Sequence, residues 1–227
     1  MRRLAAAGLA AAALGGCGST HTGGSATLWI TRDRGQHVLR VDKVKAGQTA
    51  MQALQQVMTV KTSYGGRFVQ AIDGVAGDRS GRRDWFYFVN GYEADRGAAD
   101  YTLHPGDVEW WDYRSWKQEM HVPVVVGAFP EPFLHGYLGK TRPAAIVFDE
   151  KALEPQARAL GKLIHAKAVT AEEIGDANVL FLTKADVPLS ATTKAAGAPV
   201  RFVIGPTAAR RLLAHPKLVR FRYSGLR

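Results

Sequence analysis

The alternation of apolar and polar residues predicts the first elements of the chain. Residues 27–33 and 38–44 each alternate as strands do, and Asp33-Arg34-Gly35 between them predicts a turn. Apolar residues then recur at helical spacing after Thr49, which is a favourable N-cap. This spacing predicts one amphipathic helix over about residues 50–60.

More strands are predicted after this helix. Residues 68–72, 85–89 and 108–113 have strand patterns, and Asn90-Gly91 is a strong hairpin signal because both turn residues must accept positive φ. Two strands, one helix and then several strands suit a β-grasp (ubiquitin-like) fold, in which a mixed sheet wraps one helix. We therefore expect a β-grasp domain over residues 27–119.

The second half of the chain has a different pattern. Predicted strands at 144–148, 179–182, 200–204 and 218–223 alternate with predicted helices at 152–166 and 206–214. Such alternation is typical of a small layered α/β unit, which we place at residues 122–227. The predicted fold class is α+β, with an N-terminal β-grasp domain followed by a small layered α/β domain.

The N-terminus has the features of an export signal. Two arginines precede an uncharged apolar run, and Leu14-Gly15-Gly16-Cys17 ends it. This ending resembles the lipobox of bacterial lipoproteins, in which the cysteine thiol takes a diacylglycerol after cleavage. We expect a signal peptide at 1–16, lipid attachment at Cys17 and a flexible tether over 17–26; an ordinary signal peptide with an incidental cysteine is the alternative.

This interpretation sets the expected location and partners. A lipidated Cys17 would hold a soluble body at the extracytoplasmic face of the cell membrane, with membrane lipid as one partner. The formal net charge of +10 suits an anionic envelope surface. Nucleic acid is not expected as a partner, because the basic residues are dispersed and export removes that partner.

Aromatic residues are concentrated on two predicted strands. Period-two alternation places Trp85 with Tyr87 on one face of their strand, and Trp111 with Tyr113 on one face of another. The opposite faces also carry aromatic residues, such as Trp110. One set must cover the helix, whereas the other set forms either a ligand-binding surface or the interface with the second domain.

The stretch from Asp84 to Trp116, DWFYFVNGYEADRGAADYTLHPGDVEWWDYRSW, resembles the bacterial domain DUF4430. The earlier Val44-x-x-Gly47-x-Thr49 and Tyr64-Gly65-Gly66-x-Phe68 elements add to the resemblance, which covers about residues 27–117. DUF4430 is similar to the C-terminal β-domain of the transcobalamin and intrinsic-factor family, and to the soluble-ligand-binding β-grasp group. The resemblance implies a β-grasp fold and binding of cobalamin or another bulky small molecule. The helical barrel of the animal cobalamin carriers has no counterpart in residues 122–227.

These observations predict a ligand-binding lipoprotein that is not an enzyme. The common nucleophile, phosphate-loop, dinucleotide and zinc-protease motifs are all missing from the sequence. No cofactor or metal is expected, other than a corrinoid bound as the ligand and handed to a membrane importer. His121 and His135 are the better placed of seven histidines for an axial or metal-ligand role, although surface or packing roles are more common. The alternative is an envelope interaction or scaffold module that uses an exposed aromatic face. The expected ligand-binding residues are Tyr64, Trp85, Tyr87, Asn90, Trp110, Trp111, Tyr113 and Trp116.

Overall fold

The computed structural model describes residues 23–168 and 174–226. The expected signal peptide, Cys17 and most of the expected tether lie outside the described residues. The first strand begins at Ser25, so the last two residues assigned to the tether belong to the folded body. Within the described part of the chain, no helix is long and apolar enough to cross a membrane.

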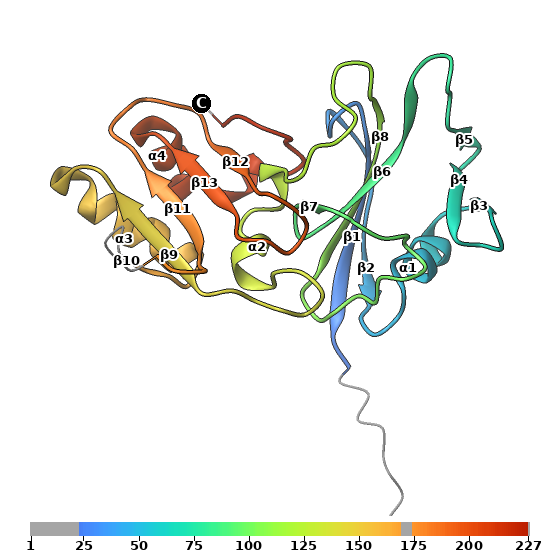
Figure 1. The fold of residues 1–227 in the computed structure, drawn as a ribbon, viewed down its shortest axis with the longest axis horizontal. Helices are drawn as coiled ribbons and strands as arrows, with labels where there is room; N and C mark the ends of the chain where they lie inside the picture. The colour runs from blue at the N-terminus through green and yellow to red at the C-terminus, as the bar shows by residue number, and fades with distance from the viewer. Residues whose placement is uncertain (1–22, 169–173, 227) are drawn as a thin grey trace, which may run out of the picture.

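A five-stranded sheet forms the middle of the molecule (Figure 1). Its first strand, β1, pairs antiparallel with β2 and parallel with β8, and β8 pairs antiparallel with β6. The order across the sheet is β2-β1-β8-β6-β7. The strands are β1 (Ser25–Arg32), β2 (His37–Lys45), β6 (Arg83–Val89), β7 (Tyr92–Glu93) and β8 (Val108–Ser115).

One face of this sheet is covered by a helix and a small second sheet. Thr49 and Gln52 form a capping box at the start of α1 (Ala50–Val57), whose buried residues include Met51 and Leu54. The small sheet, in the order β3-β4-β5, contains β3 (Val60–Ser63), β4 (Phe68–Ile72) and β5 (Val75–Ala76). The helix is therefore shorter than predicted, because the chain is already extended in β3.

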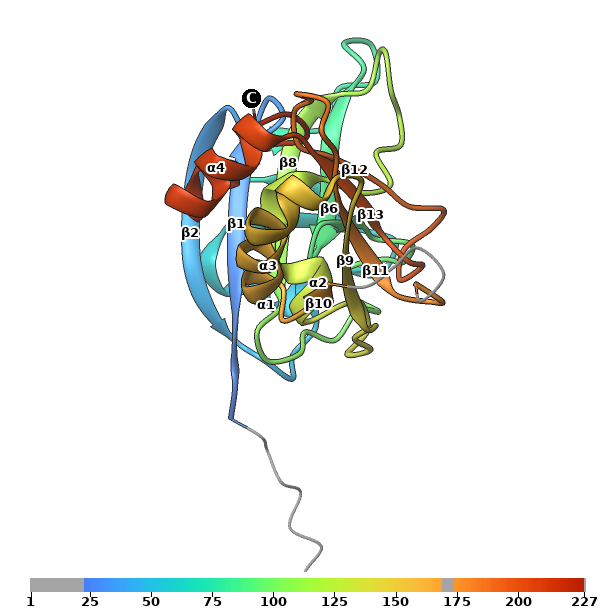
Figure 2. The ribbon, with the colours of Figure 1, turned by 90° about the vertical axis from the view of Figure 1, so that its left-hand side faces the viewer.

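The second half of the chain contains a separate, mainly parallel sheet. Its order is β10-β9-β11-β13-β12, and only β12 runs antiparallel to its neighbour. Figure 2 shows α3 and α4 in front of this sheet. The elements are the 3₁₀ helix η1 (Val126–Ala128), α2 (Glu131–Leu134), β9 (Ala144–Phe148), the 3₁₀ helix η2 (Lys151–Leu153), α3 (Glu154–Leu163), β10 (Lys167–Ala168), β11 (Asn178–Leu182), β12 (Ser190–Thr192), β13 (Arg201–Ile204), α4 (Pro206–Ala214) and the 3₁₀ helix η4 (Pro216–Val219).

These elements confirm a mixed α and β protein with several sheets. One predicted element is wrong: residues 218–223 form no strand, because η4 occupies their first two positions. Phe221 has a φ of +62°, which interrupts an extended path at that residue. The rings of Phe221 and Tyr223 still pack against the first sheet. This explains why apolar residues alternate along the segment although it forms no strand.

The second face of the first sheet packs against the C-terminal half. Trp110 is fully buried there, and its ring lies 5.7 Å from that of Phe88 and 5.4 Å from that of Tyr223. Val125 and Ala128, at η1, complete the cover. The interface alternative is therefore confirmed for this face, and Trp110 is not part of an exposed aromatic surface.

Candidate functional site

A cavity of about 190 Å³ lies between the first sheet and the elements that cover its helix side. Residues of α1 and β4 form one wall, and aromatic residues of β6 and β8 form another. The loop that contains Gly97 closes one side. The lining residues are Met51, Arg67, Phe68, Val69, Trp85, Tyr87, Arg96, Gly97, Ala98 and Trp111.

The aromatic wall is built by cross-strand pairing. Tyr87 and Trp111 are paired in register on β6 and β8, and their rings stack 4.8 Å apart at an angle of 18°. Trp85 lies one pair further along the same face, and its ring is 5.3 Å from that of Tyr113. Three predicted binding residues, Trp85, Tyr87 and Trp111, are thus brought together in one cavity.

The polar atoms of these three side chains are engaged within the protein. Trp85 Nε1 donates to the carbonyl of Val75 at 2.8 Å, and the Tyr87 hydroxyl donates to the carbonyl of Arg96. Trp111 Nε1 donates to Oε1 of Glu109 at 2.6 Å. The wall therefore offers a ligand mainly apolar ring surface, which favours binding by packing and stacking.

Glu109 supports this wall from inside the core. Its carboxyl is fully buried, and Oε2 has no hydrogen-bond partner among the described residues. Burial raises the pKa of Glu109 well above the ordinary value for a glutamate. A protonated, neutral Glu109 fits this environment, and it fixes the orientation of the Trp111 indole.

Two arginines supply the charge at the cavity. Arg67 contacts Asp100 through Nη2 at 2.6 Å, and Arg96 contacts Asp95 through Nε at 2.9 Å. The hydrogen bond from Arg96 lowers the pKa of Asp95, so that this carboxylate is ionised at neutral pH. Both ion pairs are exposed, and each guanidinium retains N–H groups that have no acceptor among the described residues. An anionic group could therefore be bound at this edge of the cavity.

The outer side of the cavity carries an exposed aromatic pair. Phe68 lines the cavity and is 50% exposed, and Tyr64 beside it is 83% exposed. Their rings meet edge to face at 6.3 Å. Tyr64 has a φ of +52° at the start of the Tyr-Gly-Gly turn. Tyr64, one of the expected ligand-binding residues, therefore lies beside the cavity but does not line it.

The other predicted binding residues lie elsewhere. Asn90 is buried and joins three segments, because its amide donates to Asp107 at 2.7 Å and to the carbonyl of Gly136 at 2.9 Å, and its Oδ1 accepts from the Val108 N–H. Tyr113 is buried behind Trp85 and donates to the carbonyl of Ala76 at 3.1 Å.

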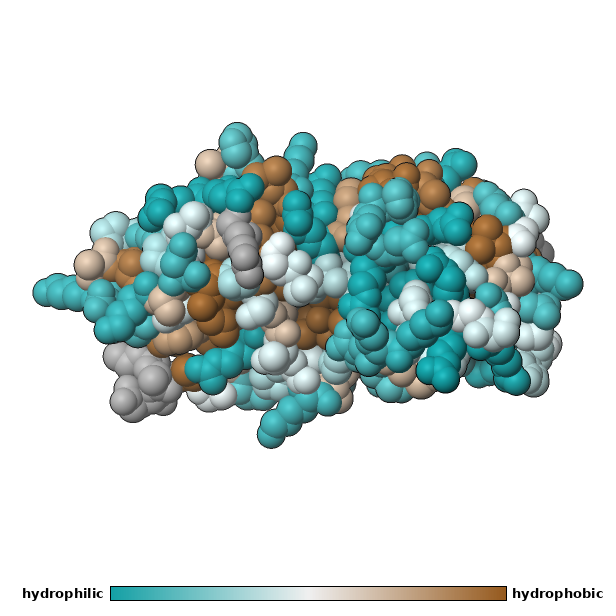
Figure 3. Space-filling model, turned by 90° about the horizontal axis from the view of Figure 1, so that it is seen from above, coloured by the Kyte–Doolittle hydropathy of each residue, from teal (hydrophilic) through white to brown (hydrophobic). Residues whose placement is uncertain are grey.

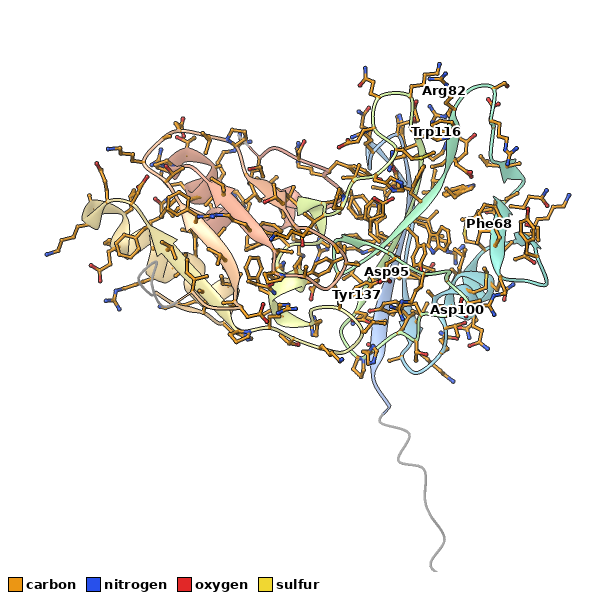
Figure 4. The ribbon with its side chains drawn as sticks, viewed as in Figure 1. Phe68, Arg82, Asp95, Asp100, Trp116 and Tyr137 are labelled. Carbon is orange, nitrogen blue, oxygen red and sulfur yellow. The ribbon has the colours of Figure 1, made fainter. Side chains whose placement is uncertain are left out.

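Trp116 is also distant from the cavity. It follows the end of β8, and the guanidinium of Arg82 lies 5.9 Å from its ring. Figure 4 shows Trp116 and Arg82 at the upper end of the first sheet, whereas Phe68 lies well below them, near α1.

Several lining residues were not predicted from the sequence to have a binding role. They are Met51, Arg67, Phe68, Arg96 and Ala98, although the motifs that include Phe68 and Ala98 had been noted.

The histidines that were considered as ligands are engaged in pairs with carboxylates. His121 Nδ1 lies 3.4 Å from Glu93, and His135 Nδ1 is hydrogen-bonded to Glu131. Within the described ranges, no group of three or more histidine, cysteine, aspartate or glutamate side chains is arranged to hold a metal ion.

A known protein family matches the part of the chain that contains the cavity. Residues 47–115 match the model of DUF4430, a domain of unknown function. This match confirms the resemblance found from the sequence motifs. Every residue that lines the 190 Å³ cavity belongs to this DUF4430 segment. Larger cavities of about 500, 370 and 320 Å³ are lined almost entirely by residues outside it.

Two solved structures are similar to part of the chain. A proposed metal-binding protein from Ruminococcus gnavus is 14% identical, with a TM-score of 0.34, over 40% of this chain and 97% of that chain. Haptocorrin in complex with Cbi is 13% identical, with a TM-score of 0.31, over 40% of this chain and 25% of that chain. No curated protein matches the chain.

Proposed function

We propose that this protein is a lipid-anchored, non-enzymatic protein that binds a small molecule in the cavity of its DUF4430 segment. The observation that carries the proposal is that all ten residues lining this cavity fall within residues 47–115, the segment matched by the family model. We also assign a β-grasp fold to this half of the chain. One helix, α1, packs on a mixed sheet in which β1 and β8 run parallel, which supports that assignment.

The cavity favours a ligand with a small, flat, apolar part and an anionic substituent. Its volume is about 190 Å³, and an apolar cavity of about 150 Å³ is large enough to bind benzene, so one small aromatic ring would fit. A ring of that size would pack on Tyr87 and Trp111, and a carboxylate or phosphate would contact Arg67 or Arg96.

A corrinoid is the first specific ligand to test, because the family resemblance implies one. A whole corrin ring is several times larger than this cavity, so only an edge or a substituent would enter it. The exposed Tyr64 and Phe68 would then contact the remainder of the ring from outside.

A lipid anchor would suit a protein that captures its ligand at the membrane surface. A lipid on Cys17 would hold the cavity near the membrane surface, where tethering raises its effective concentration beside a membrane importer. The importer and the lipid are both part of the proposal, and they rest on the N-terminal sequence.

A second candidate function is docking of a protein partner on the same side of the molecule. The exposure of Tyr64 and Phe68, at 83% and 50%, favours it, because paired exposed aromatic residues often mark interaction surfaces. A concave cavity beside this pair favours the small-molecule function over the docking function.

The test fills the cavity without removing its wall. Trp85 and Trp111 are only 8% and 3% exposed, so truncating either would damage the core. Ala98→Leu instead adds apolar volume at a lining position; because Ala98 is itself 3% exposed, near-UV circular dichroism must first show that the variant keeps native packing. Ala76→Leu makes the same change at an exposed position on β5 that does not line the cavity.

Native mass spectrometry of the protein purified from its own host should show a co-purifying small molecule. We expect Ala98→Leu to lose this molecule and Ala76→Leu to retain it. Titration calorimetry with cobalamin examines the corrinoid separately. Equal retention of the molecule by both variants would contradict the small-molecule function and favour partner docking. The same conclusion would follow if the unmodified protein carried no bound molecule and gave no heat with cobalamin.

A further inference from the structure

A second cavity, of about 500 Å³, lies where the β1–β2 turn meets the segment after η4. It is separate from the cavity of the DUF4430 segment and shares no lining residue with it. Three arginines, Arg34, Arg220 and Arg222, line it, and no carboxylate does. Figure 3 shows the molecule from above, where hydrophilic residues and apolar patches are mixed over the surface.

Two of these arginines have hydrogen-bond donors that the protein leaves unused. Arg222 donates from Nε to the carbonyl of Leu218 at 2.9 Å, and its other N–H groups have no acceptor in the described ranges. The guanidinium of Arg220 lies over the face of Trp29, 6.0 Å from the ring centroid, and its N–H groups likewise have no acceptor among those residues. Both side chains therefore bring positive charge and unused N–H groups to this cavity, although the Glu131 carboxyl lies near enough to Arg220 to interact with its charge.

The third arginine is held by a weak, displaceable contact. Both Nη atoms of Arg34 lie 3.2 Å from Oε2 of Glu119, and the two side chains are 36% and 49% exposed. An exposed ion pair of this kind contributes only about 0–1 kcal/mol, so a doubly charged ligand could compete with Glu119 for the guanidinium.

The walls of this cavity are held in fixed positions by one buried carboxylate. Asp112 accepts hydrogen bonds from the backbone N–H of Arg34 at 3.0 Å, the backbone N–H of Gly35 at 3.1 Å and the hydroxyl of Tyr223 at 3.0 Å. A Cβ at Gly35 would lie 1.7 Å from the carbonyl oxygen of Phe221, so the two segments meet at a glycine. The arginines are thus carried on backbone that is ordered before a ligand binds, which reduces the entropic cost of binding.

We propose that this cavity binds a small molecule that bears a phosphate group. The planar guanidinium of arginine matches the oxygen geometry of phosphate and donates paired hydrogen bonds to it. Gln36 and Ser224 add polar side chains that have no partner in the described part of the chain, and Phe221 adds an apolar surface for the rest of the ligand. The volume is within the usual range for small-molecule sites.

If the protein is anchored through Cys17 as proposed above, the position of the cavity favours a soluble ligand over a lipid headgroup. Figure 1 shows the start of β1 at the lower end of the molecule and the β1–β2 turn at the upper end. A strand of eight residues spans about 25 Å, so the cavity lies at that distance from the point where the N-terminal segment joins the sheet.

The test uses titration calorimetry with pyrophosphate and with inorganic phosphate at constant ionic strength. We expect saturable binding of pyrophosphate, weakened at least tenfold by the double variant Arg220→Gln/Arg222→Gln. Arg210→Gln removes an exposed arginine of α4 that does not line the cavity, and it should leave the affinity within a factor of two. Ser224→Asp places a negative charge on the wall and leaves every arginine in place. It should also weaken binding at least tenfold, so it tests the same cavity even if the double variant fails to fold.

Sedimentation with phosphatidylglycerol vesicles distinguishes the source of the phosphate. Vesicle binding that is lost in the double variant and is not competed by pyrophosphate would assign the phosphate to a lipid headgroup. Absence of saturable binding to both phosphates and to vesicles would overturn the proposal. An equal loss of affinity in Arg210→Gln would also overturn it, because it would show attraction to overall charge alone.

Discussion

The hydroxyl of Tyr223 donates a hydrogen bond to Oδ2 of Asp112 at 3.0 Å. Asp112 belongs to β8 in the middle of the first sheet, and Tyr223 lies close to the C-terminal end of the chain. Both residues are buried, and burial together with the nearby Asp112 carboxylate raises the pKa of Tyr223 well above its ordinary value. This hydrogen bond therefore joins the two halves of the molecule in their shared core.

Removing this hydroxyl should destabilise the whole protein. Tyr223→Phe keeps the ring that packs on Trp110 and Phe88 but leaves Asp112 with one donor fewer. We expect the free energy of unfolding to fall by about 1–2 kcal/mol, as measured by urea denaturation. Tyr64→Phe is the matched control, because Tyr64 is 83% exposed and should change stability little. Equal stability of both variants would show that the hydrogen bond contributes nothing at this junction.

The N-terminal half should not form a well-packed structure alone. In a fragment of residues 23–119, Trp29, Phe88 and Trp110 would lose the cover of Val125 and Tyr223. We expect far-UV circular dichroism to persist, near-UV signals to be weak and the dye ANS to bind. Residues 23–227 are the control. A fragment with sharp near-UV signals and no ANS binding would show that this half packs without the second half.

Stability should depend on pH through Glu109. Because burial raises the folded-state pKa of Glu109, the folded protein keeps this proton at pH values where the unfolded chain has lost it. The free energy of unfolding therefore falls as the pH rises above about 4.3, the ordinary glutamate value, towards the folded-state pKa. Each unit of the shift corresponds to about 1.4 kcal/mol.

Glu109→Gln tests this effect, because glutamine can still accept the hydrogen bond from Trp111 Nε1. The variant should be more stable than the unmodified protein at pH 7.5, and the difference should shrink as the pH is lowered to 4. Denaturation curves at pH 4, 5.5 and 7.5 measure it. A variant that is less stable at pH 7.5 would mean that the carboxylate is ionised and stabilising in the folded state.

The N-terminal cysteine should determine the location of the protein. Cys17→Ser would prevent lipidation, so we expect the protein to move from the detergent-extracted membrane fraction to the soluble fraction. Immunoblotting of the two fractions measures this shift. A conservative change in the expected tether, Ser19→Thr, is the control. Retention of the serine variant in the membrane fraction would argue against lipid attachment at this residue.

The sequence pattern predicted the faces of the aromatic strands well. Period-two alternation separated Trp111 and Tyr113 from Trp110, and the structure places them on opposite sides of β8. The sequence could not show which face would be covered, because that depends on where a segment about a hundred residues further along the chain packs. Trp110 and Tyr223 meet only in the folded protein.

The limits of the site prediction have similar causes. Trp116 continues the aromatic run of β8 in the sequence, but β8 ends at Ser115, and Trp116 pairs with Arg82. Asn90 was expected near the ligand, whereas its amide is used within the core. Arg67 and Arg96 were missed because a surface arginine has no pattern of its own, and only the fold brings the two to one cavity.

The position of β1 has a mechanical consequence. β1 is hydrogen-bonded along its length to β2 on one side and to β8 on the other, and the chain enters it directly at Ser25. A pull on the N-terminal segment, along the strand, would load both rows of hydrogen bonds in shear, so that many must break together. A protein held by its N-terminus would therefore transmit a pulling force directly into a strand that is paired on both sides.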